Sequence, residues 1–493
     1  MEFDEQQQVR IEKLAAIRAS GTEPYPLRTE RTLTNAEAVA EFERREGERH
    51  TLVGRVMLKR DVGKLAFLRV RDGSGPNADG EIQFFAQQKT LGDEAHRFLT
   101  KMLDLGDIVQ GTGTLIRTRT GEISLDIDTI TLLAKALSPL PDKHKGLQDV
   151  EQRYRRRYLD LINNDEARRV AIMRSRIVAA VRRYMDGLGF LEVETPTLQP
   201  QYGGAAARPF VTHHNTLDQQ LYLRIADELY LKRLIVGGLE RVYEICKDFR
   251  NEGVDRFHNP EFTMMECYQA YADYHAMMAL VEGLFAHVAD TVLGARTLVY
   301  GEHTIDLSPP WPRVKLRDAI LRATDIDYMV IEDTEELRRR ARAAGADVPS
   351  DMVRARIIDE MLKTFVRPHL IQPTFLIEYP VELSPLAKRL PHDPRVVERF
   401  QPYLAGSEIG NAFTELNDPL DQLARFEEQA AARAAGDAEA MPVDEDFVLA
   451  LMQGMPPTGG LGIGIDRLTM LFTNQPSIRD VVLFPALRST EGL

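Results

Sequence analysis

Between Thr51 and Leu133 the chain alternates apolar and polar residues in short runs that end at glycine or aspartate. This period of two is typical of strands with one buried face, and the turn residues separate five such runs. The runs span 51–60, 63–72, 80–87, 107–118 and 121–133. A helical segment near 93–104 lies between the third and the fourth. The pattern predicts an OB-fold β-barrel, a fold that commonly binds single-stranded nucleic acid.

The barrel accounts for only a small part of the 493 residues. Single hydrophobic cores stop growing at roughly 250–300 residues, so at least two domains are expected. The predicted parts are a helical segment (1–48), the OB-fold (49–136), a linker (137–152) and a larger domain (153–493). The larger domain mixes helices and strands, which indicates an α+β fold with an antiparallel sheet. Helices are expected at 5–19, 36–46 and 166–188, at 420–440 facing solvent, and in an insertion at about 332–365.

Composition narrows the class of protein. Hydrophobic residues make up 44% and charged residues 28%, which is typical of a folded globular chain. A net charge of −13 argues against non-specific nucleic-acid binding by the whole surface, although a local basic surface is compatible with it. Two cysteines exclude a disulfide framework. The chain begins without a signal-peptide pattern and has no apolar run of about 20 residues, so we expect a cytoplasmic protein without a membrane span.

Polar side chains are concentrated on two expected strands and their connecting loop at 241–274. Arg250 and Glu252 share one strand face, and so do Glu266 and Tyr268, because side chains two apart point the same way. Arginine suits phosphate, since its planar guanidinium matches the oxygens and keeps its charge. From spacing alone the segment is either a phosphate-binding hairpin or an ordinary salt-bridged one. The basic run RYRRRY at 153–158 likewise leaves two alternatives, a solvated helix face or a phosphate contact.

The segment at 241–274 resembles motif 2 of the class II aminoacyl-tRNA synthetases. A long helix followed by GFLEVETP at 189–196 is similar to motif 1, and GIGIDR at 462–467 is similar to motif 3. Each motif is short, but three in order behind an OB-fold form a specific signal. The resemblance covers nearly the whole chain and is closest to the bacterial-type lysyl-tRNA synthetases. The phrases at 203–238, 369–380 and 408–416 carry this narrower likeness.

The resemblance implies a class II catalytic domain built on an antiparallel sheet flanked by helices. It also implies an activity: lysine and ATP give lysyl-adenylate and pyrophosphate, and lysine then passes to the 3′-terminal adenosine of tRNA(Lys). Mg²⁺ is the implied cofactor, and a homodimer joined through motif 1 is the implied assembly.

The residues that match the family's ATP site are Arg250, Glu252, His258, Phe262, Glu408 and Arg467. The resemblance makes Arg250 and Arg467 the catalytic residues, because fixed positive charge suits the negative charge that builds up on phosphate oxygens. Phe262 would stack on adenine. Glu408 would bind Mg²⁺, but the acidic residue usual seven positions earlier is Gln401 here. A neutral amide brings no charge to the metal, which predicts a raised Mg²⁺ requirement.

The residues that match the family's lysine pocket are Gly204, Glu228, Glu266, Tyr268, Asn411, Phe413 and Glu415. Glu228, Glu266 and the Gly204 backbone would receive the α-amino group. Glu415 and Tyr268 would receive the ε-ammonium, because a buried ammonium needs an opposite charge. Asn411 would help to hold the carboxylate, and Phe413 would pack on the aliphatic stem.

Three barrel residues, Phe67, Gln83 and Glu122, match family positions that read the anticodon. Phe67 would stack on the central uridine while the polar pair reads base edges. The alternative is that Phe67 belongs to the barrel core and that the other two are ordinary surface residues.

Two rival functions remain compatible with the motifs. A class II enzyme for aspartate or asparagine shares the OB-fold, but the acidic pocket disfavours it, since an aspartate pocket needs a cation. A catalytically inactive or tRNA-independent paralogue is the second rival, and it is disfavoured because this chain keeps the barrel, Arg250 and Arg467.

Overall fold

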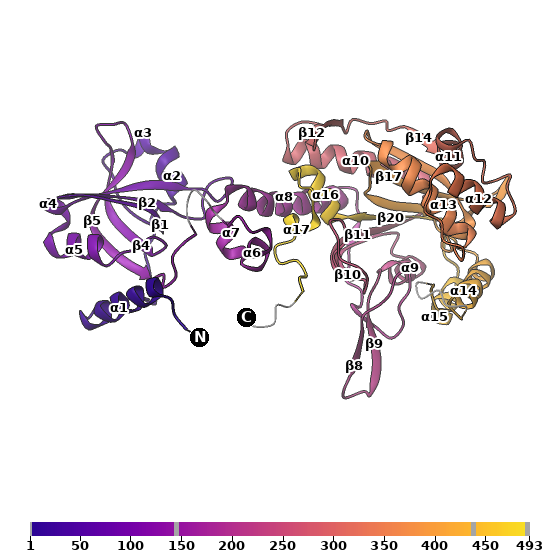
Figure 1. Ribbon diagram of the computed structural model, residues 1–493, viewed down its shortest axis with the longest axis horizontal. Helices are drawn as coiled ribbons and strands as arrows, with labels where there is room; N and C mark the ends of the chain where they lie inside the picture. The colour runs from indigo at the N-terminus through magenta and orange to yellow at the C-terminus, as the bar shows by residue number, and fades with distance from the viewer. Residues whose placement is uncertain (1, 142–146, 435–439, 489–493) are drawn as a thin grey trace. The chain divides into compact units, whose positions relative to one another are not determined.

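The computed structural model describes residues 2–141, 147–434 and 440–488. They form two compact units that divide between Ile172 and Met173, inside helix α8 (Asp165–Gly187) (Figure 1). The domain limits expected at 48, 136 and 152 stay predictions. Residues 142–146 of the expected linker and 435–439 of the expected helix at 420–440 lie outside the described residues.

The first unit is built on a five-stranded barrel. Its strands are β1 (Arg49–Val62), β2 (Leu65–Arg71), β3 (Glu81–Gln87), β4 (Ile108–Arg117) and β5 (Ile123–Ala134). They close in the order β1-β2-β3-β5-β4, and β3 pairs with β5 in parallel while the other neighbours are antiparallel. Helices α4 (Gln88–Leu91) and α5 (Asp93–Lys101) lie between β3 and β4. The predicted OB-fold, with its helix after the third strand, is confirmed.

The chain before the barrel is helical, as expected, but in three pieces. Helix α1 (Glu5–Ala19) begins at a capping box formed by Asp4 and Gln7. The single helix predicted at 36–46 is wrong, because α2 (Asn35–Ala40) and α3 (Phe42–Arg45) are separated at Glu41. Glu41 has φ −99° and ψ 12°, outside the helical region, and the break lets Phe42 enter the barrel core.

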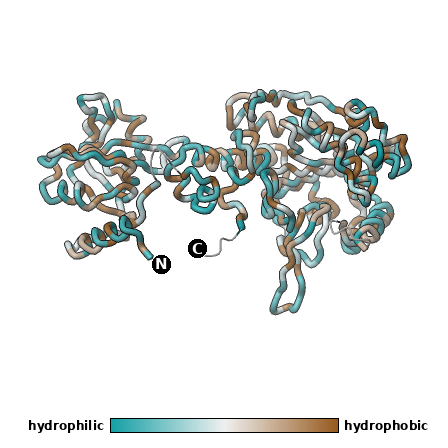
Figure 2. Tube along the Cα trace, in the orientation of Figure 1, coloured by the Kyte–Doolittle hydropathy of each residue, from teal (hydrophilic) through white to brown (hydrophobic). Residues whose placement is uncertain are grey.

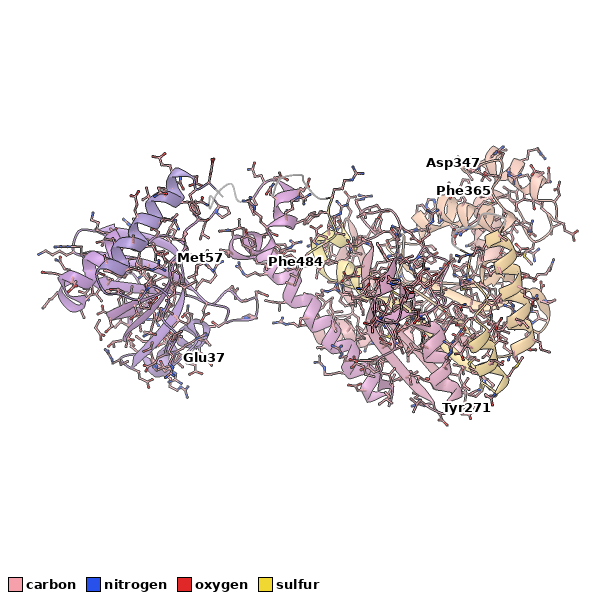
Figure 3. All side chains as sticks on the ribbon, turned by 90° about the horizontal axis from the view of Figure 1, so that it is seen from below. Glu37, Met57, Tyr271, Asp347, Phe365 and Phe484 are labelled. Atoms are coloured by element: carbon pink, nitrogen blue, oxygen red, sulfur yellow. The ribbon has the colours of Figure 1, made fainter. Side chains whose placement is uncertain are left out.

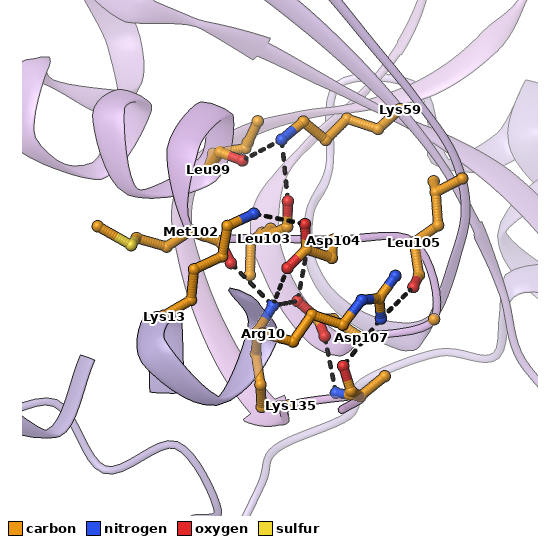
Figure 4. A network of polar contacts seen from close by, with 12 residues as sticks. Arg10, Lys13, Lys59, Leu99, Met102, Leu103, Asp104, Leu105, Asp107 and Lys135 are labelled. Carbon is orange, nitrogen blue, oxygen red and sulfur yellow. Dashed lines mark hydrogen bonds and ion pairs between the residues drawn. The ribbon is translucent and has the colours of Figure 1, made fainter. Parts of the chain in front are cut away.

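A charge network ties α1 to the barrel (Figure 4). The buried ammonium of Lys135 lies 2.6 Å from a carboxylate oxygen of Asp104 and 2.8 Å from one of Asp107. Lys13 of α1 contacts the other oxygen of Asp104 at 2.6 Å. Arg10 donates to backbone carbonyl oxygens of the barrel unit, with distances from 2.8 to 3.2 Å.

The basic run at 153–158 lies in two short helices. They are α6 (Val150–Arg155) and α7 (Arg157–Asn163). Arg157 is buried and donates to Asp160 at 2.8 Å, and Arg153 donates to the same carboxylate at 3.2 Å. Arg153 and Arg157 therefore pair with a buried carboxylate, whereas Arg156 and Tyr158 of the same run are exposed, and the phosphate contact stays a prediction.

The second unit is built on a sheet with ten strands among the described residues. They are β6 (Leu191–Glu192), β10 (Arg241–Phe249), β11 (Glu261–Ala270), β14 (Arg313–Lys315), β15 (Thr374–Pro380), β16 (Arg389–Leu390), β17 (Asp393–Leu404), β18 (Ser407–Glu408), β19 (Gly410–Thr414) and β20 (Thr458–Gly464). The main order is β14-β15-β17-β19-β20-β11-β10-β6, and β16 and β18 pair with β17. The predicted antiparallel sheet is confirmed at its centre, whereas β14–β15 and β10–β6 at its ends pair in parallel.

Helices flank this sheet (Figure 1). They are α8, α9 (Glu228–Val236), α10 (Tyr274–Val292), α11 (Leu316–Thr324), α12 (Thr334–Ala344), α13 (Arg354–Met361), α14 (Pro419–Ala434), α15 (Glu445–Met452), α16 (Ile465–Thr473) and α17 (Ile478–Val481). The smaller pieces are β7 (Leu198–Gln199), β8 (Val211–His214), β9 (Gln219–Leu223), β12 (Thr297–Tyr300), β13 (His303–Asp306), η1 (Leu362–Val366), η2 (Arg367–His369) and η3 (Val381–Leu383). Strands β8 and β9 form a projecting hairpin with a hydrophilic tip (Figure 2).

The expected helices of this unit are largely confirmed. Helix α8 matches the prediction at 166–188 within a residue at each end. Helices α12 and α13 fall in the expected insertion at 332–365, where Figure 3 labels Asp347 and Phe365. Helix α14 buries Phe426, so the expectation of a solvent-facing helix is wrong for that side. Within the described parts of the chain, none of the helices is long and apolar enough to span a bilayer.

The two faces of the sheet have different environments. On one face, Met265, Cys267 and Ile463 pack with α8, α10 and α16 in a single core. On the other face, Tyr268 and Phe413 pack with α9 and the helices that follow β14. Because side chains alternate along a strand, the residues between the core positions of β11 and β19 point to this second face, where the cavity lies.

Candidate active site

A cavity of about 690 Å³ opens on the second face of the sheet. It is lined by every residue predicted for the ATP site and the lysine pocket, and also by Gln401. The structure therefore brings together residues from motif 2, motif 3 and the segments between them. What each residue binds stays a prediction.

Two rows of residues across β11, β20 and β19 form the floor of the cavity. In the first row Glu266, Gly462 and Asn411 are paired, and in the second Tyr268, Gly460 and Phe413. Glycines in the middle strand leave room for the large side chains on either side. A Cβ atom at Gly460 would lie 1.8 Å from Oε1 of Glu415 and 2.6 Å from the Tyr268 ring.

Acidic side chains surround the buried end of the cavity. Glu228 and Glu266 are almost fully buried and Glu415 is completely buried. Tyr268 donates its hydroxyl to Glu266 at 3.2 Å. Gly204 has φ 88°, a left-handed conformation that favours glycine, and a Cβ there would meet Glu228 at 3.1 Å. These contacts place the acids predicted for the two ammonium groups in one enclosure.

Lys232, which the sequence analysis missed, lies inside this acidic cluster. Its ammonium is 2.5 Å from Oε1 of Glu228 and forms an ion pair with Glu415. The side chain is completely buried. Its only sequence signal is its position four residues after Glu228, which puts both on one face of α9.

Burial raises the pKa of each carboxyl group in the cluster. For Glu415 and Glu228, the positive charge of Lys232 opposes this effect without cancelling it. For Glu266, neighbouring Asp227 adds to the effect of burial, and its pKa lies well above the ordinary value. Burial also raises the pKa of Asp227 to about 7. The pocket is therefore an environment that favours the arrival of positive charge.

Cations and an aromatic ring line another part of the cavity. The guanidinium of Arg250 lies 5.0 Å from the centre of the Phe262 ring. Arg467 donates to the backbone carbonyl of Glu408 at 2.8 Å and lies 3.4 Å from Nε2 of His258. Burial lowers the pKa of Arg467, and Arg367 and Arg250 act in the same direction. Two arginines beside an aromatic ring suit a nucleotide with several phosphates.

Arg399 is a further cation that sequence reasoning missed. Its Nε donates to Oδ1 of Asn411 at 2.8 Å, and its other donors reach Ser384 Oγ at 2.9 Å and the Leu383 carbonyl at 2.6 Å. It lines the cavity and fixes the orientation of the Asn411 amide. Arg399 lies two residues before Gln401 on β17, so both side chains point to the same face of the sheet. This spacing was the signal that could have indicated Arg399.

The residues present fit a metal ion that takes one carboxylate from the protein. Glu408 is half-buried at the cavity wall. The amide oxygen of Gln401 accepts hydroxyl groups from Tyr379 at 2.7 Å and Tyr403 at 2.9 Å. It is therefore already engaged, whereas Glu408 offers a charged oxygen. Mg²⁺ commonly takes its remaining ligands from phosphate and water.

The predicted anticodon residues lie on the outer surface of the barrel. The Phe67 ring stacks on Phe85 at 5.2 Å, and both are only partly buried, so the core alternative for Phe67 is wrong. Gln83 donates to Ser124 at 2.9 Å, and Glu122 accepts from Arg69 at 3.4 Å. Phe85 and Arg69 were missed, although alternation along β2 and β3 places them on the same face. Two partly buried aromatic rings and an exposed cation on one face suit stacking of unpaired bases.

A five-stranded OB-fold barrel and a polar cavity on a largely antiparallel sheet are the two main features of the chain. Both parts match known protein families. Residues 149–488 match the family model for class II tRNA synthetases (D, K and N), and residues 50–133 match that for the OB-fold nucleic acid binding domain. The chain belongs to the class II tRNA synthetases.

Similar proteins over the full length of the chain are named for one amino acid within this class. The chain is 56% identical to the lysine–tRNA ligase of Roseiflexus sp. (strain RS-1) and 54% identical to that of Chloroflexus aurantiacus, over 99% of each chain in both cases. It is 50% identical to the lysine–tRNA ligase of Bacillus subtilis (strain 168), over 99% of this chain and 98% of the relative.

Proposed function

We propose that the chain is a lysine–tRNA ligase that uses ATP and acts as a cytoplasmic homodimer. One observation carries the choice of lysine. Glu228, Glu266 and Glu415 surround the buried end of a cavity whose other wall holds Arg250 and Arg467. An ammonium side chain is the substrate group that such an end accepts, because buried carboxylates need a partner of opposite charge.

In the first step, a carboxylate oxygen of lysine attacks the α-phosphorus of ATP. The new P–O bond forms as the bond to the pyrophosphate oxygen breaks, giving lysyl-adenylate and pyrophosphate. Arg250 would stabilise the charge that develops on the α-phosphate oxygens, and Arg467 would hold the γ-phosphate. Mg²⁺, held by Glu408, would neutralise charge on the phosphates when bound. Holding two anions in line supplies much of the rate.

In the second step, the 2′- or 3′-hydroxyl of the terminal adenosine of tRNA(Lys) attacks the lysyl carbonyl carbon. The ester bond forms, AMP leaves with the electron pair of the anhydride bond, and the hydroxyl proton is lost to a phosphate oxygen or water. Phe67, Gln83 and Glu122 would read the anticodon from the outer face of the barrel.

Exposed apolar residues around motif 1 support the homodimer. Leu191 of β6 is 51% exposed and Leu198 is 48% exposed. Apolar side chains this exposed beside an edge strand are typical of a surface that another chain covers.

The test is amino-acid-dependent ATP–pyrophosphate exchange with lysine, aspartate and asparagine, followed by charging of tRNA(Lys). We expect exchange with lysine alone, and its loss by about a thousandfold in Arg250→Ala, because the charge that stabilises the transition state is removed. Lys247→Ala, on the same strand β10 but pointing away from the cavity, is the matched control and should retain exchange. Exchange with aspartate or asparagine, or no exchange with lysine, contradicts the proposal.

A further inference from the structure

The side chain of Lys232 is a cation built into the amino-acid end of the cavity. Its ammonium lies 5.3 Å from the centre of the Phe413 ring and 5.9 Å from those of Tyr268 and Phe447. The Lys232 side chain is completely buried among these rings. Among the described residues, its ammonium has two ionic partners, Glu228 and Glu415. A buried ammonium this enclosed needs carboxylates to hold its charge.

Lys232 uses only part of what these carboxylates offer. It pairs with Oε2 of Glu415, while Oε1 of Glu415 has no hydrogen-bond partner among the described residues. Glu415 lines the cavity, and its second oxygen is buried beside Gly460. An ammonium group that enters this end of the cavity would supply the missing donor. A buried acceptor without a donor costs free energy, which a ligand with an ammonium group recovers on binding.

The net charge of the cluster matches the positive charge of one kind of ligand. With all groups ionised, Glu228, Glu266 and Glu415 contribute three negative charges and Lys232 one positive charge, leaving two negative charges. Free lysine brings two ammonium groups, and Arg250 lies elsewhere in the cavity for its carboxylate. Without Lys232, the three carboxylates would carry one more negative charge than the two ammonium groups of lysine neutralise.

We propose that Lys232 is a positioning residue that sets the charge of the pocket to match the two ammonium groups of lysine, opposes protonation of Glu228 and Glu415, and keeps the two carboxyl groups apart. The inference rests on the proposed function and deepens it. Its consequence is that lysine binding releases fewer protons from the Glu228–Glu415 pair when Lys232 is present than when it is removed. The other ionisable groups that face this pair are Glu266 and Tyr268 on β11, Asp227 before α9, and Arg399 on β17.

The experiment counts protons. Lysine is titrated calorimetrically into the full-length protein at pH 7 in two buffers with different protonation enthalpies. In Lys232→Met the two buried acids repel each other without a counter-ion, so they should retain one shared proton. We expect this variant to release about one more proton per lysine than the unmodified protein. Its KM for lysine in exchange should rise about tenfold at pH 7 and fall again as the pH is raised towards 8.5.

Two further variants separate charge from structure. Lys232→Arg keeps the charge and should retain the proton count and the pH profile of the unmodified protein, even if its larger head group raises KM. Lys135→Met removes an equally buried lysine from the barrel and, at a temperature at which circular dichroism shows it folded, should alter neither readout. If Lys232→Met does not fold, Lys232→Gln, which keeps a donor but not the charge, replaces it.

The outcomes are distinct. An unchanged proton count in a folded Lys232→Met or Lys232→Gln variant that binds lysine overturns the inference. The same holds if Lys232→Arg releases the extra proton, because then the charge is not what matters. If the unmodified protein binds no lysine, the proposed function fails instead.

Discussion

The barrel and the synthetase unit each bury a lysine between two carboxylates, but only one of the clusters is complete. In the barrel, Lys135 contacts Asp104 and Asp107 (Figure 4), and their other oxygens accept from Lys13 and from the backbone N–H of Ala136. In the synthetase unit, Lys232 contacts Glu228 and Glu415, and one oxygen of Glu415 has no donor among the described residues.

This difference separates a structural ion cluster from a binding site. Burial raises the pKa of Asp104, but the hydrogen bonds from Lys13 and Lys135 outweigh it, and the pKa lies below its ordinary value. Burial raises the pKa of Glu415 too, and there Lys232 does not outweigh it. The complete cluster therefore stabilises the folded barrel at neutral pH. The incomplete one leaves the free enzyme with an acceptor that a substrate can use.

The largest expected effect comes from removing the lysine of the complete cluster. Lys135→Met leaves Asp104 and Asp107 buried without their main counter-ion, so the free energy of unfolding should fall by about 3–5 kcal/mol. A carboxyl with a lowered folded-state pKa contributes stability above its unfolded pKa and loses it as the pH falls through the folded value. The deficit should therefore shrink in acid. Urea denaturation of the full-length protein between pH 7 and pH 3, followed by a probe in the barrel, measures it.

Lys13→Met is the matched control, because Lys13 contacts the same Asp104 but its side chain is 28% exposed. A partly exposed pair contributes about 1 kcal/mol or less. Equal losses of unfolding free energy in Lys135→Met and Lys13→Met would show that burial of the lysine does not matter. That result would contradict the distinction between the two clusters.

The next effect comes from forcing the incomplete cluster out of position. In Gly460→Ala the new methyl group would overlap Oε1 of Glu415 and the Tyr268 ring, so Glu415 must leave its place beside Lys232. We expect kcat/KM for lysine in ATP–pyrophosphate exchange to fall about a hundredfold, or about 2.7 kcal/mol. Gly187→Ala is the control, since its methyl group would meet no atom within 4 Å and Gly187 does not line the cavity. Losses of the same size in both variants would contradict the assignment of Glu415.

Sequence reasoning could reach the parts of the molecule that depend on local periodicity. Alternation predicted the five barrel strands, and helical spacing predicted α1 and α8. Motif likeness selected the residues that line the cavity. The parallel pairing of β3 with β5 was out of reach, because it depends on closure of the barrel rather than on any one segment.

The incomplete cluster shows why the rest could not be predicted. In the sequence, Lys232 looks like one more cation on an amphipathic helix, and Glu415 follows directly after β19, far along the chain. Their contact exists only because α9 packs over β11 and β19. The role of Gly460 has the same origin, since its missing side chain matters only when Glu415 and Tyr268 meet above it. Similarly, nothing near Gln401 in the sequence indicates that Tyr379 will engage its amide oxygen.

The smallest effect tests whether the excess of negative charge is confined to the amino-acid end. In the Gln401→Glu variant, the new carboxylate can accept the same hydrogen bonds from the Tyr379 and Tyr403 hydroxyl groups. It also adds a negative charge near Glu408. Because Mg²⁺ prefers charged oxygen ligands, its concentration for half-maximal exchange should fall about threefold to tenfold. The KM for lysine should stay constant, since the Lys232 cluster is untouched. Glu408→Gln is the opposing control and should raise the Mg²⁺ requirement. An unchanged Mg²⁺ dependence in Gln401→Glu would mean that the amide at this position imposes no deficit, and that Glu408 with the phosphates suffices for the metal.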